Sequence, residues 1–154
     1  RKIISASISG SIFAILLSII IPNPFGQTIS TIPDYLFSIA INTPGYLIYS
    51  FPAIFIYGVL TSTLSDLISQ FISKKIKSEK SEIIFSFLLH VVFGLILFLY
   101  SLGASLLFFI TDRILQKKKK NIQPLQAIKS LGIPLAVWLF FMGIVYLEHI
   151  LNHA

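Results

Sequence analysis

Asp66 and His90 are the two residues whose type and position best fit chemistry, because each places an ionisable side chain within a long apolar stretch. Ionisable groups inside apolar segments are costly and often functional. Asp66 would exchange protons or bind a cation, and His90 would relay protons with it if both lie at similar depth. The simpler interpretation, which we favour, is an interfacial acid beside the lysines near residue 74 and a hydrogen-bonded packing histidine.

A second candidate is the histidine pair near the end of the chain. His149 and His153 are four residues apart, so on a helix they would lie on one face and could chelate zinc or another transition metal. The protease signature His-Glu-x-x-His does not match here, since Glu148 precedes His149 directly. We expect a solvated helix end and no metal.

Other catalytic signatures are missing from the sequence. The chain has no cysteine, which excludes a disulfide, a thiol nucleophile and a thiolate metal site. We find no glycine-rich phosphate loop, no Gly-x-Ser-x-Gly elbow and no paired carboxylates at catalytic spacing. The sequence therefore predicts a protein that is not an enzyme and that needs no cofactor.

Charge and hydropathy set the class of protein. Of 154 residues, 55% are hydrophobic and 12% are charged, compared with about 25% charged in soluble domains. The basic residues flank apolar stretches, in three groups: Arg1–Lys2, Lys74–Lys80 and 113–129. This pattern is typical of a membrane protein. The net charge of +6 does not favour nucleic-acid binding, because the charges cluster at segment ends rather than on a polar face.

The apolar segments between these charges indicate an all-α integral membrane protein. We predict a single domain over 1–154 with four transmembrane helices. The predicted spans cover residues 3–21, 46–72, 83–110 and 131–151. Residues 34–41 are too short to cross, so we expect a separate interfacial helix there, with Asp34 as a possible N-cap. Pro52 is expected to kink the second span.

Small residues predict how the helices pack. Ala6, Gly10 and Ala14 repeat at four-residue spacing in the first span, and Gly58 and Ser62 do so in the second, on the face that also carries the acid described above. Such stripes allow close backbone approach in lipid. The alternative for the first stripe is chance in a helix rich in serine and alanine.

Residues 83–110 create a conflict in topology. A 28-residue helix would be about 42 Å long, which exceeds the hydrocarbon core of about 30 Å. If it crosses once, six basic residues lie on each side, against the rule that cytoplasmic loops carry the positive charge. Either hydrophobic length overrides the rule, as we favour, or the stretch breaks near Gly103 and re-enters, leaving three spans. The third possibility is dual insertion as an antiparallel dimer.

The run Tyr57–Ser62, followed by Ser65 and Asp66, together with the Ile-, Phe-, Ser- and Lys-rich composition, resembles small four-span membrane proteins of Gram-positive bacteria. The resemblance implies a multi-pass protein of the bacterial cell membrane, and that group has no established activity to carry over. The charge pattern places the N-terminus in the cytoplasm.

For function, we expect a non-enzymatic helical module, such as an immunity, accessory or regulatory subunit that acts through helix contacts. The expected partners are the lipid bilayer and either further copies of the chain or a larger membrane protein. The alternative is a small transporter or channel, possibly an antiparallel dimer, that uses Asp66 and His90.

Overall fold

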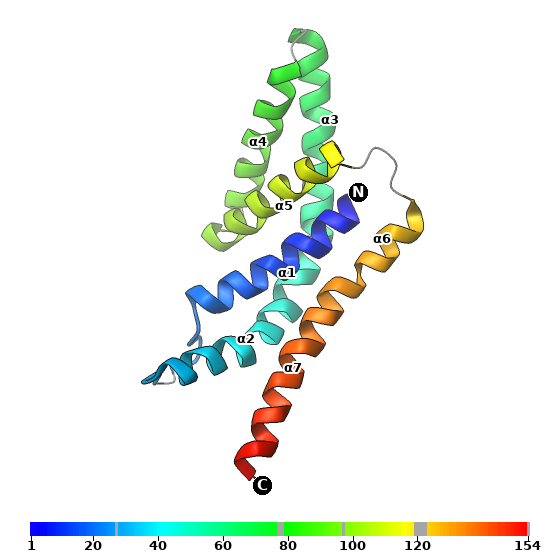
Figure 1. Cartoon of the computed structure of the whole chain (residues 1–154). Helices are drawn as coiled ribbons and strands as arrows, with labels where there is room; N and C mark the ends of the chain where they lie inside the picture. The colour runs from blue at the N-terminus through cyan, green and yellow to red at the C-terminus, as the bar shows by residue number, and fades with distance from the viewer. Residues whose placement is uncertain (27, 77–78, 97, 119–122, 154) are drawn as a thin grey trace.

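The computed structural model describes residues 1–26, 28–76, 79–96, 98–118 and 123–153. Its elements are α1 (Lys2–Ile20), α2 (Ile32–Ala53), the π-helical turn η1 (Ile54–Gly58), α3 (Val59–Ile76), α4 (Glu79–Ile96), α5 (Phe98–Lys118), α6 (Pro124–Ser130) and α7 (Gly132–His153) (Figure 1). Over these residues there is no strand, and the predicted all-α fold is confirmed.

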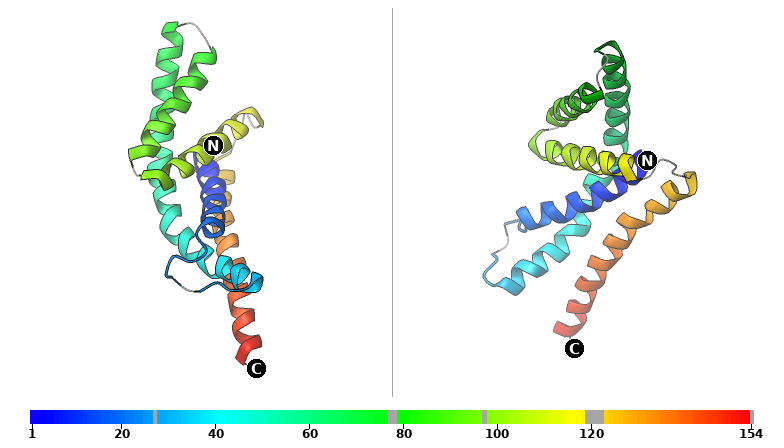
Figure 2. Two further views of the ribbon diagram at one scale, coloured as in Figure 1. Left: turned by 90° about the vertical axis from the view of Figure 1, so that its left-hand side faces the viewer. Right: turned by 45° about the horizontal axis from the view of Figure 1, so that its top comes forward.

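Helix α1 lies at the centre of the molecule, with α5 on one side and α2 on the other (Figures 1 and 2). Ala6, Gly10 and Ala14 are all buried along it. A Cβ at position 10 would lie 2.9 Å from a ring carbon of Phe51 in α2. The glycine therefore allows that aromatic ring to sit directly on the α1 backbone.

The start of α2 corrects the predicted segment 34–41. The helix begins at Ile32, where Thr31 is the N-cap and Asp34 completes a capping box by accepting from the Thr31 backbone N–H at 3.0 Å. These residues are thus the first turns of a continuous helix and not a separate interfacial segment. Asp34 supports the cap from the N3 position instead of being the N-cap.

Three side chains of α2 fasten it to the C-terminal end of α1. The hydroxyls of Tyr35 and Tyr46 donate to the carbonyl oxygens of Ile19 and Ile21, at 2.8 and 2.9 Å. The hydroxyl of Thr43 lies 2.7 Å from that of Ser18 in α1. The two tyrosine bonds satisfy carbonyl groups that the end of a helix leaves without intrahelical partners.

The chain changes direction just after Pro52. The π-helical turn η1 begins two residues later, and Figure 1 shows the helix bending there as α2 leads into α3. Proline lacks the N–H that the preceding turn needs, and a π-turn re-forms the ladder with one extra residue. The result is a bent helical run from Ile32 to Ile76.

The stretch predicted as one helix over 83–110, or as a helix broken near Gly103, forms two helices, of which α4 ends at Ile96 and α5 begins at Phe98. Gly103 lies inside α5. The two helices pack against each other at Gly94, where an added Cβ would lie 2.9 Å from the Ser105 Cβ and 3.0 Å from the Leu102 Cα. This close approach is what allows α5 to fold back along α4.

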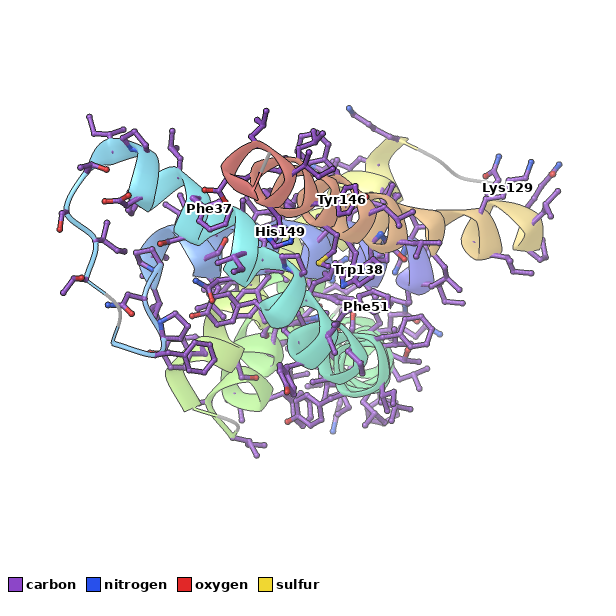
Figure 3. The ribbon with its side chains drawn as sticks, turned by 90° about the horizontal axis from the view of Figure 1, so that it is seen from below. Phe37, Phe51, Lys129, Trp138, Tyr146 and His149 are labelled. Atoms are coloured by element: carbon purple, nitrogen blue, oxygen red, sulfur yellow. The ribbon has the colours of Figure 1, made fainter. Side chains whose placement is uncertain are left out.

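Helix α7 runs beside α2, and Figure 3 labels Trp138 and Tyr146 on it and Lys129 in the last turn of α6. Pro134 sits in its first turn, where the missing N–H costs little. Within the described residues, three helical runs are long and apolar enough to cross a membrane: Lys2–Ile20, Ile32–Ile76 and Pro124–Leu151.

Candidate functional site

An ion-pair cluster joins the N-terminal end of α1 to α3 and α5. The Arg1 guanidinium contacts Asp66 and Asp112, with each N···O distance 2.9 Å. The Lys2 ammonium contacts the same two carboxylates at 2.7 and 2.8 Å. Two acids from different helices therefore share two cations from a third, which ties α1, α3 and α5 together.

Asp112 is the most enclosed member of the cluster, at 2% exposed. Besides the two cations, it accepts a hydrogen bond from the Ser5 hydroxyl at 3.0 Å. Burial alone would raise the pKa of Asp112, but the hydrogen bond and charge of Lys2, with the charge of Arg1 and the bond from Ser5, outweigh it and lower the pKa. Asp112 is therefore an ionised carboxylate with its oxygens occupied.

Arg113 completes the cluster from α5. Its guanidinium lies 3.5 Å from Asp66 and 3.9 Å from Glu82 of α4, and it sits over the Phe109 ring at 5.4 Å from the centroid. The contact with Asp66 is an ion pair without hydrogen-bond geometry. Arg113 thus adds a fourth helix to the cluster and shields the aromatic ring behind it.

The cluster is electrically balanced, with three cations and three carboxylates: Arg1, Lys2, Arg113, Asp66, Asp112 and Glu82. Asp66 was expected to pair with the lysines near residue 74 or to act as a free acid. Its carboxylate instead faces Arg1, Lys2 and Arg113. A carboxylate that already contacts three cations leaves little room for a further cation.

His90 lies on α4, one helical turn after Ser86, and is buried. Its Nδ1 is 2.7 Å from the Ser86 carbonyl oxygen, and the Ser86 hydroxyl lies 3.5 Å from Asp66. The structure therefore brings the two predicted candidates close together through Ser86. The Nε2 atom of His90, in contrast, is buried and has no hydrogen-bond partner among the described residues.

A cavity of about 220 Å³ adjoins His90, between η1, α4, α5 and α1. Its walls are largely apolar, with Phe13, Ile54, Ala104 and Phe108 among the residues that line it. This region coincides with the core of the molecule, since Ala6, Ile54, Ala104 and Phe108 form its buried apolar cluster. The cavity therefore adjoins the apolar core of the molecule.

The small residues of the second predicted span contribute to the apolar core beside the cavity and to the ion-pair cluster. A Cβ on Gly58 would lie 3.2 Å from a Phe108 ring carbon, so the glycine admits that ring to the core. Ser62 is fully buried and its hydroxyl accepts a hydrogen bond from the Lys2 ammonium at 2.5 Å. Gly58 therefore contributes packing, while Ser62 contributes to the ion-pair cluster.

The predicted metal candidates gain no further ligands. Among the described residues, no group of three or more His, Asp or Glu side chains is placed to hold a metal ion. His149 lies on the exposed surface of α7 (Figure 3). The side chain of His153 lies outside the described part of the structure, so the geometry of this pair is not defined.

Sequence reasoning missed the main feature of the site. Asp112 and Arg113 follow the third apolar stretch and were not among the predicted site residues. They contact different partners, and Asp112 is buried against Arg1 and Lys2, more than 100 residues away in sequence. The available signal was that acids as well as bases lie near the ends of apolar stretches, where packed helices can bring them together.

Comparison with known proteins gives no match to a family model, to a curated protein or to a solved structure. Inferences about function therefore rest on the geometry of the chain.

Proposed function

We propose that this chain is a non-enzymatic module of the bacterial cell membrane that acts through helix contacts, with its N-terminus in the cytoplasm. The observation that carries the proposal is the balanced cluster, in which charges inside the bundle neutralise one another instead of facing a substrate. The outward surface is apolar instead: for example, Leu139 and Tyr146 on α7 are 56% and 64% exposed. Such a surface suits lipid or another membrane helix.

We propose three spans and a re-entrant hairpin in place of four spans. The apolar part of α4, Glu82–Ile96, has 15 residues and would be about 22 Å long, which is less than the hydrocarbon core. Helix α5 then returns to the end of the bundle where α1 begins, because Asp112 contacts Arg1. A stretch that enters and returns this way leaves the flanking loops on one side.

This topology also removes the conflict in charge. With α4 and α5 re-entrant, the N-terminus, the 74–80 loop and the 113–129 segment share one side, which carries all twelve Lys and Arg residues. A four-span arrangement divides them equally. The rule that positive residues remain cytoplasmic therefore favours three spans.

The rival proposal, a transporter that uses Asp66, is tested by reconstitution. In vesicles with an imposed pH gradient and a pH-sensitive dye inside, the chain is expected to dissipate the gradient no faster than protein-free vesicles do. The reason is that the Asp66 carboxylate is held by three cations. Proton flux that disappears in Asp66→Asn and persists in the Asp34→Asn control would establish transport instead.

The helix-contact proposal is tested by photo-crosslinking in the membrane. A benzophenone amino acid replaces Leu139 or Tyr146, which lie two turns apart on the exposed face of α7, or the fully buried Ala14 as a control. We expect light to produce a discrete protein adduct from the α7 positions and none from position 14. Lipid adducts alone at both α7 positions would contradict the proposal.

A further inference from the structure

The cavity described above extends along the helices that enclose it. Its lining residues run from Tyr100 to Phe108 on α5, which is about 12 Å at 1.5 Å per residue, and from Ser50 to Thr61 on the bent run of α2, η1 and α3. Ala53 and Tyr100 are exposed, whereas Phe108 is buried. The cavity therefore leads inward from a mouth between α2 and α5 to an end in the apolar core.

The inner part of the cavity offers few polar atoms to an occupant. Nδ1 of His90 lies 2.7 Å from the Ser86 carbonyl oxygen, and Nε2 is buried, so the imidazole presents no open nitrogen there. The remaining two hydroxyls of the lining, on Tyr100 and Ser101, lie at the mouth end of α5. The other four donate to backbone carbonyls: Ser50 to Tyr46, Tyr57 to Phe93, Thr61 to Tyr57 and Ser105 to His90. An occupant of the inner part must therefore be apolar.

The cavity lies far along the helices from the charged end of the bundle. Phe13, which lines it from α1, is about 16 Å along that helix from Lys2, and Tyr100 at the mouth is about 18 Å along α5 from Asp112. The hydrocarbon core of a bilayer is about 30 Å thick. With the ion-pair cluster at the cytoplasmic end, both helices place the mouth within that core, where the surrounding molecules are lipid chains.

The size of the cavity indicates how much of a lipid chain it can take. A cavity of about 150 Å³ with apolar walls holds benzene, so in proportion a cavity of about 220 Å³ holds about nine carbons. An elongated space of this size fits the end of an acyl chain. An empty apolar cavity leaves its lining atoms without contacts, and a chain that fills it restores the dispersion attraction.

We propose that the cavity holds the methyl end of a phospholipid acyl chain, which enters between Ala53 and Tyr100 and reaches Ala104 and Phe108. The apolar walls bind the chain by close contact, because hydrocarbon surroundings supply no hydrophobic drive of their own. The inference rests on the membrane location proposed above, since only in a bilayer does the mouth face acyl chains. It does not require a protein partner.

The test uses two phospholipid photoprobes that differ in depth. The full chain is reconstituted in phosphatidylcholine vesicles that contain a phosphatidylcholine with a diazirine group near either the methyl end or the carboxyl end of one acyl chain. After illumination, mass spectrometry of peptides locates the adducts. We expect the methyl-end probe to label Ala104 and Phe108, which are 8% and 1% exposed, and the carboxyl-end probe to label neither. Leu60, 60% exposed on α3 and outside the cavity lining, reports contact of the methyl-end probe with bulk lipid.

Variants at the mouth locate the entry of the chain. Ala53→Phe and Ser101→Phe each place a ring in the mouth from a different helix, so the adducts at positions 104 and 108 are expected to disappear while the Leu60 adduct remains. The matched control is Ala136→Phe, at an exposed alanine of α7 outside the lining, which should preserve every adduct.

The outcomes separate this proposal from the membrane location on which it rests. Label on Leu60 with none on Ala104 or Phe108 would overturn the lipid site and leave the membrane location standing. An unlabelled Leu60 would overturn both. Inner adducts that persist in both mouth variants would also refute the proposal, because the chain would then not enter between α2 and α5.

Discussion

Replacing Asp112 with asparagine is expected to lower the free energy of unfolding by about 3–5 kcal/mol, the usual cost of removing one partner from a buried ion pair. The substitution keeps the size of the side chain but removes its charge, so Arg1 and Lys2 keep Asp66 as their one shared carboxylate. The new amide is neutral and lies at a position where the native Asp112 is 2% exposed. Thermal unfolding in detergent, followed by circular dichroism at 222 nm, measures the effect as a lower Tm.

A double variant separates the charge from the packing. When Lys2→Met is combined with Asp112→Leu, both members of the Lys2–Asp112 pair become apolar, and most of the lost stability should return. Asp34→Asn is the matched control, because it removes a carboxylate from an exposed capping box at the other end of the bundle. If Asp112→Asn and Asp34→Asn lower the Tm equally, the cluster does not hold the bundle together.

The second large effect concerns topology, and it is close to all-or-none. Because the chain lacks cysteine, single cysteines can be introduced at three exposed positions, Thr28, Gln123 and Leu151. In intact cells, we expect an impermeant thiol reagent to label positions 28 and 151 and to spare position 123, since a re-entrant α4–α5 hairpin keeps the basic 113–129 segment in the cytoplasm. Permeabilised cells should be labelled at all three.

The four-span arrangement predicts the opposite pattern at two of these sites. Position 123 would be labelled in intact cells and position 151 would be protected, while position 28 would stay labelled in both arrangements and report that the reagent works. Partial labelling at every site would indicate dual insertion, and with it an antiparallel dimer. The three outcomes differ qualitatively, so the assignment does not rest on small differences in labelling.

Sequence reasoning predicted the parts of this structure that depend on neighbours along the chain. The fold class follows from long apolar stretches with basic ends, and the bend follows from Pro52, where the π-helical turn begins two residues later. The prediction of a separate helix over residues 34–41 was wrong, and the reason is also local in the sequence. The Thr31–Asp34 capping box starts the helix early, and Pro44 is accommodated inside it without ending it.

The break between α4 and α5 was harder to locate. Residues 83–110 are apolar nearly throughout, so no polar punctuation marks the position of the turn. A break near Gly103 was the alternative to one long helix, since glycine weakens helices. The glycine that matters is Gly94, whose missing side chain lets α5 approach α4. That role depends on which helix lies opposite, which the spacing of residues does not encode.

By itself, the sequence determined that the chain is helical, that three of the four predicted spans fall on helices long and apolar enough to cross a membrane, and that the acids available for chemistry are few. Only the tertiary structure decided that Asp66 faces Arg1 and Lys2 and that His90 is buried beside a cavity. The physical reason is that helices apolar on nearly every face give little periodicity to indicate which side is buried. Their partners are set by close packing and by neutralisation of buried charge, which act between residues far apart in the chain.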